Sequence, residues 1–260
     1  MPIKKICCQT LVFLFFSLFS MLVAGNALGR TPLSTYLAEE RSTRIECEYD
    51  GVIYHYDVYV PAGYYGSSDK NYPVIFIFSP GGNATMNTME HWIKAHHWIA
   101  VMLVESRNGP WSPIIGNFFA AYDDVVERLS ISKDMKILAG FSGGARACSL
   151  MALQQFRPGL HGIFLQGAGF YGYCGDCYPG KPYVYASFGD QDSNIGEIDW
   201  IKSDYDSSGR FFTYEVFSGT HQWAPRDVAE RALDWLSTRP VRRTGVLTAP
   251  IIQLLLNGSS

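Results

Sequence analysis

The sequence has no large excess of charge of either sign, since 21 Lys and Arg stand against 24 Asp and Glu, a formal net charge of -3. A protein that binds nucleic acid is expected to carry a marked basic excess, so no nucleic-acid partner is predicted. The sequence also lacks internal repeats, low-complexity linkers and insertions long enough to form a second domain. We therefore expect one domain over residues 28–240, followed by a tail over 241–260 to which no role is assigned.

Cysteines at metal-ligand spacing are also scarce, because the C-x-x-C pattern occurs only once, as Cys174-Gly-Asp-Cys177. A zinc site of this kind needs a second pair of Cys or His ligands, and none stands nearby in the sequence. We therefore predict no metal and interpret the pair as a local disulfide, with a redox motif as the alternative. Cys148 falls in an apolar helical stretch and is interpreted as a small buried side chain.

No hydrophobic run in the sequence reaches the roughly 20 residues that a membrane-spanning helix needs. The run from Leu11 to Val23 follows two lysines and precedes several small residues, which is the layout of a secretory signal. We predict that residues 1–27 form this signal, with cleavage after Gly25 or Ala27. The mature protein is then expected to be secreted or periplasmic, with no stable membrane association. An uncleaved membrane anchor is the alternative.

Short apolar runs alternate along the chain with stretches of helical periodicity. Two strands at 43–49 and 52–60 come first, and the glycine after Asp50 favours an antiparallel hairpin. The later runs suit strands buried on both faces, and they lie at 73–78, 98–104, 136–141, 162–166, 183–188 and 211–217. Helices are expected at 89–95, 115–129, 144–155, 195–205 and 226–237. We therefore predict an α/β fold with a mostly parallel sheet of about eight strands, helices on both faces and little or no cap domain. The segment 167–181 is the expected place for a small lid.

The segment Gly140-Phe-Ser-Gly-Gly144 has the form G-x-S-x-G, and its surroundings make this short motif specific. An apolar strand precedes it, and a helix-forming stretch from Ala145 to Leu153 follows it. This is the setting of a nucleophile elbow, in which small neighbours let strand and helix approach while the serine side chain projects above the sheet. We therefore predict that Ser142 is a nucleophile. A glycine-rich turn with a surface serine is the alternative.

A serine hydroxyl is a weak nucleophile until a base takes its proton, so an active serine requires a histidine and an acid that orients it. Only one histidine lies beyond residue 161, namely His221, in a loop between the last predicted strand and the last helix. The acid is expected in the turn after the preceding strand, which reads Gly189-Asp-Gln-Asp192. We predict Asp192 as the acid, with Asp190 as the alternative, while an ordinary loop histidine is the structural interpretation of His221.

Acyl transfer also needs hydrogen-bond donors for the negative oxygen of the tetrahedral intermediate. The N–H of Gly143, directly after the nucleophile, is the first expected donor of this oxyanion hole. The second is expected from the loop after strand 73–78, which reads Ser79-Pro-Gly-Gly-Asn83. We predict Gly82 as this donor, with Asn83 as the alternative, and a plain strand-ending turn as the structural interpretation.

Together, these motifs resemble the α/β-hydrolase superfamily, in particular its exported polyhydroxybutyrate-depolymerase-like and feruloyl-esterase-like branch. The resemblance spans roughly residues 54–236 and rests on the elbow, the Gly189–Asp192 turn and Thr220-His-Gln-Trp-Ala-Pro225, which is similar to the Gly-His-x-Trp-Pro pattern of that branch. It implies the α/β-hydrolase fold and two-step acyl transfer without a cofactor. The chain has Ser79-Pro80 where the family commonly has His-Gly, which leaves the position of the second oxyanion donor open by one residue.

These features predict an exported serine hydrolase that cleaves a small-molecule or polymeric carboxylic ester. Trp111 and Trp223, with Tyr171 and Tyr173, are predicted to line the substrate cleft, and packing at the core or rim is the alternative for these aromatic residues. A serine peptidase of the same fold is one rival, although the chain has no room for a propeller-sized extra domain. A catalytically inactive hydrolase fold that only binds is the other.

Overall fold

The computed structural model describes residues 30–66, 69–153, 159–172, 182–206 and 210–241. The expected signal at 1–27, the pair Cys174 and Cys177, Tyr173 and the tail beyond residue 241 lie outside the described residues. The interpretations of these segments therefore stay predictions.

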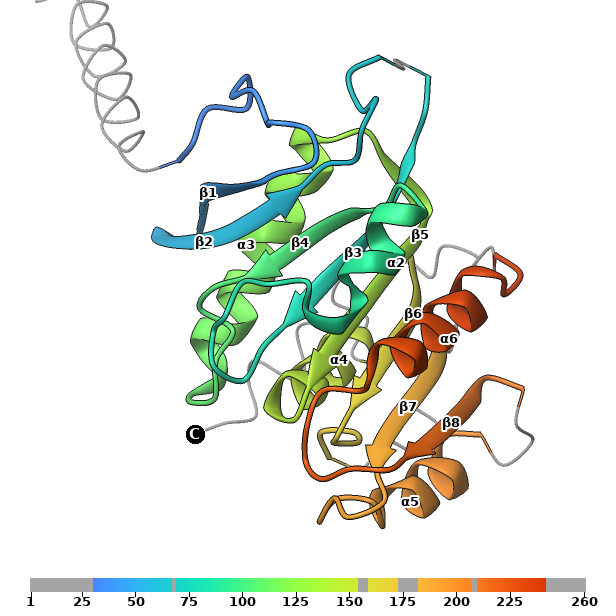
Figure 1. Cartoon of the computed structure of the whole chain (residues 1–260). Coiled ribbons are helices and arrows are strands. Elements are labelled where there is room, and N and C mark those ends of the chain that lie inside the picture. Colours follow the sequence, from blue (N-terminus) through green and yellow to red (C-terminus); the bar gives the residue numbers. More distant parts are fainter. Residues whose placement is uncertain (1–29, 67–68, 154–158, 173–181, 207–209, 242–260) are drawn as a thin grey trace, which may run out of the picture.

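Eight strands form one sheet in the order β1-β2-β4-β3-β5-β6-β7-β8 (Figure 1). β2 pairs antiparallel with both β1 and β4, and all the other neighbouring strands run parallel. The predicted mostly parallel sheet is confirmed. The strands are β1 (Ser42–Tyr49), β2 (Val52–Tyr59), β3 (Tyr72–Phe78), β4 (Ile99–Leu103), β5 (Ile131–Phe141), β6 (Leu160–Gln166), β7 (Tyr183–Gly189) and β8 (Phe212–Phe217).

The first two strands are joined by the tight turn that the sequence indicated. Asp50 and Gly51 form this turn, with φ values of 51° and 74°. Positive φ at both central residues is the geometry of the turn that matches the twist of a two-stranded hairpin, and Asp-Gly is one of the few dipeptides that adopt it readily. The turn therefore fixes the register in which Tyr49 faces Val52.

Helices cover both faces of the sheet, as predicted. One core cluster joins one face of the sheet to α3 (Trp111–Arg128), α4 (Gly143–Leu153) and α5 (Glu197–Asp204). A second cluster joins the opposite face to the 3₁₀ helix η2 (Asn87–Met89), α2 (Glu90–Ala95) and α6 (Arg226–Ser237), of which α2 and α6 lie in front of the sheet in Figure 1. Alternate residues of the central strand β3 enter the two clusters, since Phe76 packs in the first and Ile77 in the second. This explains why the central strands are continuous apolar runs.

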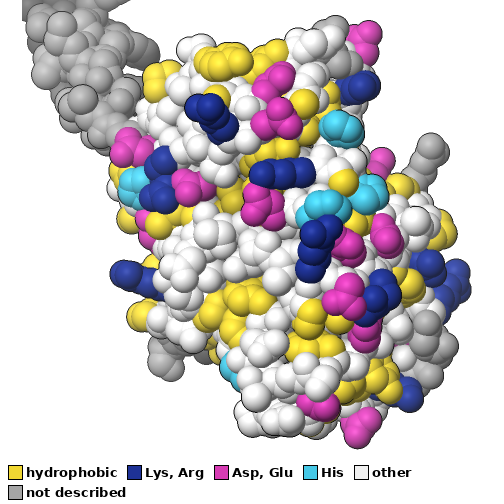
Figure 2. All heavy atoms as spheres, in the orientation of Figure 1, with side chains coloured by type: hydrophobic (Ala, Val, Ile, Leu, Met, Phe, Trp, Pro, Cys, Tyr) yellow, Lys and Arg dark blue, Asp and Glu magenta, His cyan; other side chains and the backbone are white. Residues whose placement is uncertain are grey.

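The face covered by α2 and α6 carries acidic and basic side chains close together rather than separated by sign (Figure 2). Several of them form ion pairs, among them Arg226 with Glu230 at 2.8 Å and Arg231 with Asp227 at 3.1 Å. This face therefore presents no extended patch of one charge. Within the described ranges, no helix combines the length and the apolar character that crossing a bilayer would require.

A buried ionic network fixes α3 against the sheet. The carboxylate of Asp124 accepts hydrogen bonds from Arg128 at 2.8 Å, from Arg30 at 2.8 Å and from the hydroxyl of Tyr56 at 2.5 Å. The side chains of Asp124 and Arg128 are 2% and 1% exposed. Burial, reinforced by the neighbouring Asp124 carboxylate, raises the pKa of the Tyr56 phenol, so this phenol stays neutral and donates its proton.

Because Arg128 is buried, removal of its partner is expected to destabilise the fold strongly. We predict that Asp124→Ala lowers the free energy of unfolding by about 3–5 kcal/mol, since the buried guanidinium charge of Arg128 loses its carboxylate and keeps only the carbonyl oxygens of Thr31 and Pro32 as acceptors. Urea denaturation followed by circular dichroism measures this change. The exposed neighbour provides the control, and Asp123→Ala is expected to change stability by less than about 1 kcal/mol. Equal losses in the two variants would contradict a special role for the network.

Both cysteines among the described residues, Cys47 and Cys148, are free and fully buried. Burial raises the pKa of each thiol well above its ordinary value, so neither forms a reactive thiolate near neutral pH. The interpretation of Cys148 as a small core side chain on α4 is confirmed.

Candidate active site

The segment around Ser142 forms a sharp turn between β5 and α4. Ser142 has a φ of 53°, a left-handed conformation that non-glycine residues adopt rarely and at a cost of about 1–3 kcal/mol. A Cβ added to Gly140 would overlap the carbonyl oxygen of Gly144, and one added to Gly144 would overlap the carbonyl oxygen of Phe78. The two glycines therefore let the strand and the helix approach, which is the mechanical role that the elbow motif predicted.

This close approach predicts the effect of enlarging the glycine on the helix side. Gly144→Ala is expected to lower the free energy of unfolding by about 1–3 kcal/mol, because the backbone of β3 must move away from the elbow. Gly196 is the matched control, since it has a φ of -63° and nothing lies within 4 Å of its added Cβ. Gly196→Ala should be neutral or slightly stabilising. Thermal denaturation of the two variants checks this, and an unchanged Tm for Gly144→Ala would refute the steric explanation.

The structure brings the three residues predicted from distant parts of the sequence into one hydrogen-bonded series. The Nε2 atom of His221 lies 2.9 Å from the Oγ atom of Ser142. The Nδ1 atom of His221 lies 2.9 and 3.0 Å from the two carboxylate oxygens of Asp192. We refer to this series as the relay. It lies at the carboxyl ends of β5 and β7 and in the loop after β8, at one edge of the sheet.

The chemistry of the relay fixes which histidine nitrogen carries the proton. An ionised carboxylate only accepts hydrogen bonds, so Nδ1 of His221 must donate to Asp192. Nε2 then has a lone pair that accepts the hydroxyl proton of Ser142. The side chain of Asp192 is fully buried, whereas that of His221 is 38% exposed. The relay is therefore anchored inside the protein and open to solvent at its reactive end.

Asp192 is itself held by the loop that follows β7. Its Oδ1 atom accepts the backbone N–H of Asn194 at 2.9 Å, and the Asn194 side chain donates to the carbonyl of Gly167 at 2.9 Å. The first of these bonds is an Asx-type turn, which the spacing Asp-x-Asn favours. Asn194 was missed in the sequence because such a turn is common in loops and carries no functional signal of its own.

The alternative acid, Asp190, has a different role in the structure. Its carboxylate accepts the backbone N–H of Gly219 at 3.0 Å, and its own N–H donates to the carbonyl of Phe217 at 2.8 Å. Asp190 thus connects the loop after β7, which carries Asp192, to the loop after β8, which carries His221. Among the described residues, Asp190 forms no hydrogen bond with the ring of His221. Of the two aspartates, the structure places the predicted Asp192 in the relay.

Gln166, the last residue of β6, forms hydrogen bonds with two segments of the candidate site. Its carbonyl accepts the backbone N–H of Ser142 at 2.8 Å, and its side-chain oxygen accepts the backbone N–H of Ala224 at 3.1 Å. The side chain is fully buried. The same residue therefore supports both the elbow and the loop that carries His221. No motif marks Gln166 in the sequence, because its partners are backbone groups far away along the chain.

The predicted oxyanion donors lie on two neighbouring loops, and one prediction needs correction. Gly143 is the first residue of α4, where an N–H has no acceptor within the helix. The N–H of Gly82, in contrast, donates to the carbonyl of Ser79 at 3.0 Å, so Gly82 is not the free donor that was predicted. The preceding residue, Gly81, is exposed, and its N–H has no acceptor in the part of the chain that the structure describes. Asn83 places its side-chain amide beside Gly81.

The aromatic residues predicted to line the cleft are divided between the two faces of the sheet. Trp223 packs on Phe141 with ring centroids 5.3 Å apart, and Phe141 in turn contacts the His221 ring at 4.7 Å. Trp111, the first residue of α3, packs on Tyr171 at 4.4 Å. Both tryptophans are half-buried and extend their respective core clusters. Substrate contact by these side chains stays a prediction.

The first part of the expected lid, residues 167–172, is tied to the helices beneath it. The backbone N–H of Gly169 donates to Glu197 at 2.6 Å, and that of Tyr171 donates to the hydroxyl of Ser149 at 2.8 Å. These bonds hold the segment against α4 and α5. The remainder of the expected lid, residues 173–181, lies outside the described residues.

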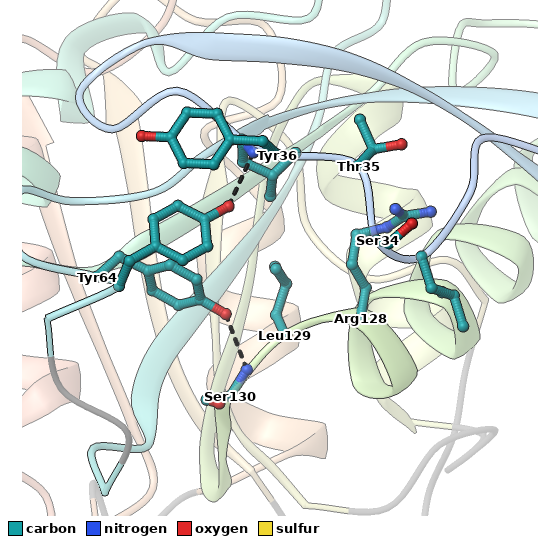
Figure 3. A pocket seen from close by; sticks show the side chains of 10 residues that line it. Ser34, Thr35, Tyr36, Tyr64, Arg128, Leu129 and Ser130 are labelled. Carbon is teal, nitrogen blue, oxygen red and sulfur yellow. Dashed lines mark hydrogen bonds between the residues drawn. The ribbon is translucent and has the colours of Figure 1, made fainter.

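A pocket of about 380 Å³ lies elsewhere, between the segment 33–37, two tyrosines and the end of α3 (Figure 3). The hydroxyl of Tyr64 accepts the N–H of Ser130, and Tyr65 accepts that of Leu37. The guanidinium of Arg128 at its wall is already bonded to Asp124. This pocket adjoins the amino ends of β3 and β5, whereas ligands of open α/β sheets bind at the carboxyl ends. The relay, and not this pocket, therefore lies where ligands of such a sheet are expected to bind.

No protein-family model matches the sequence, and no curated protein is significantly similar to it. Solved structures do match. An S-formylglutathione hydrolase from Staphylococcus aureus is 16% identical, with a TM-score of 0.59 over 75% of this chain and 98% of that one. A ferulic acid esterase is 13% identical, with a TM-score of 0.58 over 76% of this chain and 98% of that one. A thermostable esterase from Pseudomonas putida is 14% identical, with a TM-score of 0.58 over 84% and 86%. Similarity this distant establishes the fold, and the predicted α/β-hydrolase fold is confirmed.

Proposed function

We propose that this α/β-hydrolase-fold protein is a serine hydrolase that cleaves carboxylic esters through a covalent acyl-enzyme. The observation that carries the proposal is the uninterrupted relay from Asp192 through His221 to Ser142, with 2.9 Å between the base and the nucleophile. A hydroxyl and an imidazole at this distance form the pair that nucleophilic acyl transfer requires. The strained conformation of Ser142 at the elbow adds support, because strain of this kind is concentrated at functional sites.

In the proposed mechanism, Oγ of Ser142 attacks the ester carbonyl while Nε2 of His221 takes its proton. Asp192 holds the imidazole in the reactive tautomer and stabilises the imidazolium ion that forms. The N–H groups of Gly143 and Gly81 donate to the oxyanion of the tetrahedral intermediate. The imidazolium proton then passes to the leaving alcohol. His221 next takes a proton from the water that attacks the acyl-enzyme, and it returns this proton to Oγ of Ser142 as the carboxylic acid leaves. Each step uses only groups of this chain, the substrate and water.

The proposed substrate class is a small or polymeric ester that reaches an open site. The side chain of His221 is 38% exposed, so the reactive end of the relay accepts bulky acyl or alcohol groups. The structural neighbours named above include a ferulic acid esterase and a thermostable esterase, which favours esters over peptides. We also propose export, which rests on the amino-terminal residues alone.

A fluorophosphonate probe tests the proposal directly, because it reacts with an activated serine and not with an ordinary surface hydroxyl. We expect labelling of the wild-type protein, and peptide mass spectrometry should place the adduct on Ser142. A panel of p-nitrophenyl esters and aminoacyl amides then separates the reaction classes. Ester turnover supports the proposal, preferential amide turnover identifies a peptidase, and absence of both labelling and turnover identifies a hydrolase fold that only binds.

A further inference from the structure

One polar side chain beside the elbow has no place in the relay. Asn108 lies in the loop between β4 and α3, and its amide occupies the space over the Cα atom of Gly143. A Cβ added to Gly143 would overlap Oδ1 of Asn108 and would stand 2.9 Å from its Cγ atom and 3.4 Å from Nδ2. Because Gly143 has no side chain, the space beside its Cα atom is available, and the amide of Asn108 occupies this space.

The loop that carries Asn108 is fixed against the other side of the proposed oxyanion hole. The backbone N–H of Asn108 donates to the carbonyl of Pro80 at 2.8 Å, and Arg107 forms an antiparallel bridge with Gly81. Gly82 packs so closely on this loop that a Cβ there would stand 2.6 Å from the carbonyl oxygen of Val104. The backbone of Asn108 is therefore anchored beside one proposed donor loop, while its side chain reaches the other.

The amide is also free to bind a ligand. Asn108 is exposed, and its side chain has no hydrogen-bond partner in the ranges that the structure describes. An amide that stabilised the fold at this position would be expected to bond to the backbone it touches, as the amide of Asn194 does. Oδ1 is the amide atom nearest Gly143, so the NH₂ group takes its place there after a half-turn about the Cβ–Cγ bond, which no hydrogen bond of this side chain in the described ranges opposes. Turned in this way, the carboxamide offers two N–H donors, the type of group that a developing oxyanion binds.

We infer that Asn108 donates from its side chain to the oxyanion, as a third donor beside the backbone N–H groups of Gly143 and Gly81. This inference rests on the proposed function, since it assigns Asn108 to the transition state of that reaction. Removal of one buried oxyanion donor typically lowers kcat by about 10²–10³-fold. Because Asn108 is exposed to solvent, we expect a smaller loss, about 10- to 100-fold.

The test compares Asn108→Leu, which keeps the size of the side chain and removes its donors, with Asn108→Asp, which also adds a negative charge. A donor that acts only in the transition state lowers kcat and leaves KM unchanged. With p-nitrophenyl acetate we expect a 10- to 100-fold lower kcat for the leucine variant, a KM within about twofold of wild type, and a larger loss for the aspartate variant. An aryl trifluoromethyl ketone, which forms a tetrahedral adduct with the serine, should bind more weakly by the same factor as the loss in kcat.

Ser112→Ala, an exposed polar substitution at the start of the adjacent helix, is the matched control and should behave as wild type. Equal Tm values for all variants exclude a folding defect. A leucine variant with unchanged kcat and unchanged ketone affinity overturns the inference, and so does a rise in KM at constant kcat, which identifies a ground-state contact. In both cases the wild type remains active and Ser142→Ala inactive, so the proposed function survives. A wild type that neither hydrolyses esters nor reacts with fluorophosphonate refutes the proposed function and this inference together.

Discussion

Ser142→Ala is expected to lower kcat for p-nitrophenyl ester hydrolysis by about 10⁴- to 10⁶-fold, and His221→Ala by a similar factor. The two residues form one proton-transfer unit, because Nε2 of His221 lies 2.9 Å from Oγ of Ser142. Once either partner is absent, the other has nothing left to contribute. The double variant is therefore expected to be no slower than Ser142→Ala alone.

Steady-state kinetics of the two single variants and the double variant measure this non-additivity. His91→Ala serves as a control, since His91 is an exposed surface residue that pairs with Glu230 on α6. Its kcat is expected to stay within about twofold of wild type, as for surface substitutions far from the reaction. If the losses in the double variant multiply instead, Ser142 and His221 act independently and the relay is the wrong description. Unchanged Tm values across the series are required for either conclusion.

The inner strands were predictable from sequence because their burial is nearly complete, whereas the edge strands β1 and β8 are mostly exposed or half-buried. Central strands such as β4 and β7 are buried along their whole length, so every residue in them must be apolar or small. β5 extended further toward its amino end than predicted, to Ile131, because Ile131 still pairs with Tyr72 beyond an irregularity in the register that contains the polar residues 132–134. Hydrophobic continuity therefore locates the centre of a strand better than its ends.

The start of α3 was also displaced, and the reason is the proline at its first turn. The sequence predicted a helix from Ile115, the beginning of the periodic stretch, whereas α3 begins at Trp111. Pro113 lies in the first turn, where backbone N–H groups have no intrahelical acceptor, so proline is tolerated there. Trp111 consequently projects from a helix and not from a flexible loop.

The relay was predictable because its members belong to loops whose order along the chain is set by the fold. The groups that support the relay could not be predicted in this way. Gly82 was chosen because it lies in the glycine-containing loop after strand 73–78, but the direction of a glycine N–H depends on the turn around it, and this one points to Ser79. Gln166 and Asn108 act through backbone groups or neighbours that are distant in sequence. Residues of this kind are identified only when the elements are placed in space.

Asp192→Asn is expected to lower kcat by about 10⁴-fold while the fold and the position of His221 stay intact. The buried carboxylate accepts the proton of Nδ1 with both oxygens, at 2.9 and 3.0 Å. An amide in its place offers an N–H group to Nδ1, which moves the ring proton to Nε2. The nitrogen that faces Ser142 then has no lone pair with which to take the hydroxyl proton. Activity is therefore expected to fall because His221 adopts the wrong tautomer, and not because the distance between His221 and Ser142 changes.

Asp190→Asn is the matched substitution, because it makes the same chemical change two residues away on the same loop. The asparagine oxygen still accepts the N–H of Gly219, the bond that Asp190 makes at 3.0 Å, so kcat is expected to stay within about threefold of wild type. Kinetics of the two variants at several pH values make the comparison. Comparable losses in both would mean that the negative charge of the loop, and not the contact with His221, supports the reaction. A large loss of kcat confined to Asp190→Asn would identify Asp190 as the acid. The reason is that asparagine cannot replace the aspartate that holds the imidazole in the reactive tautomer.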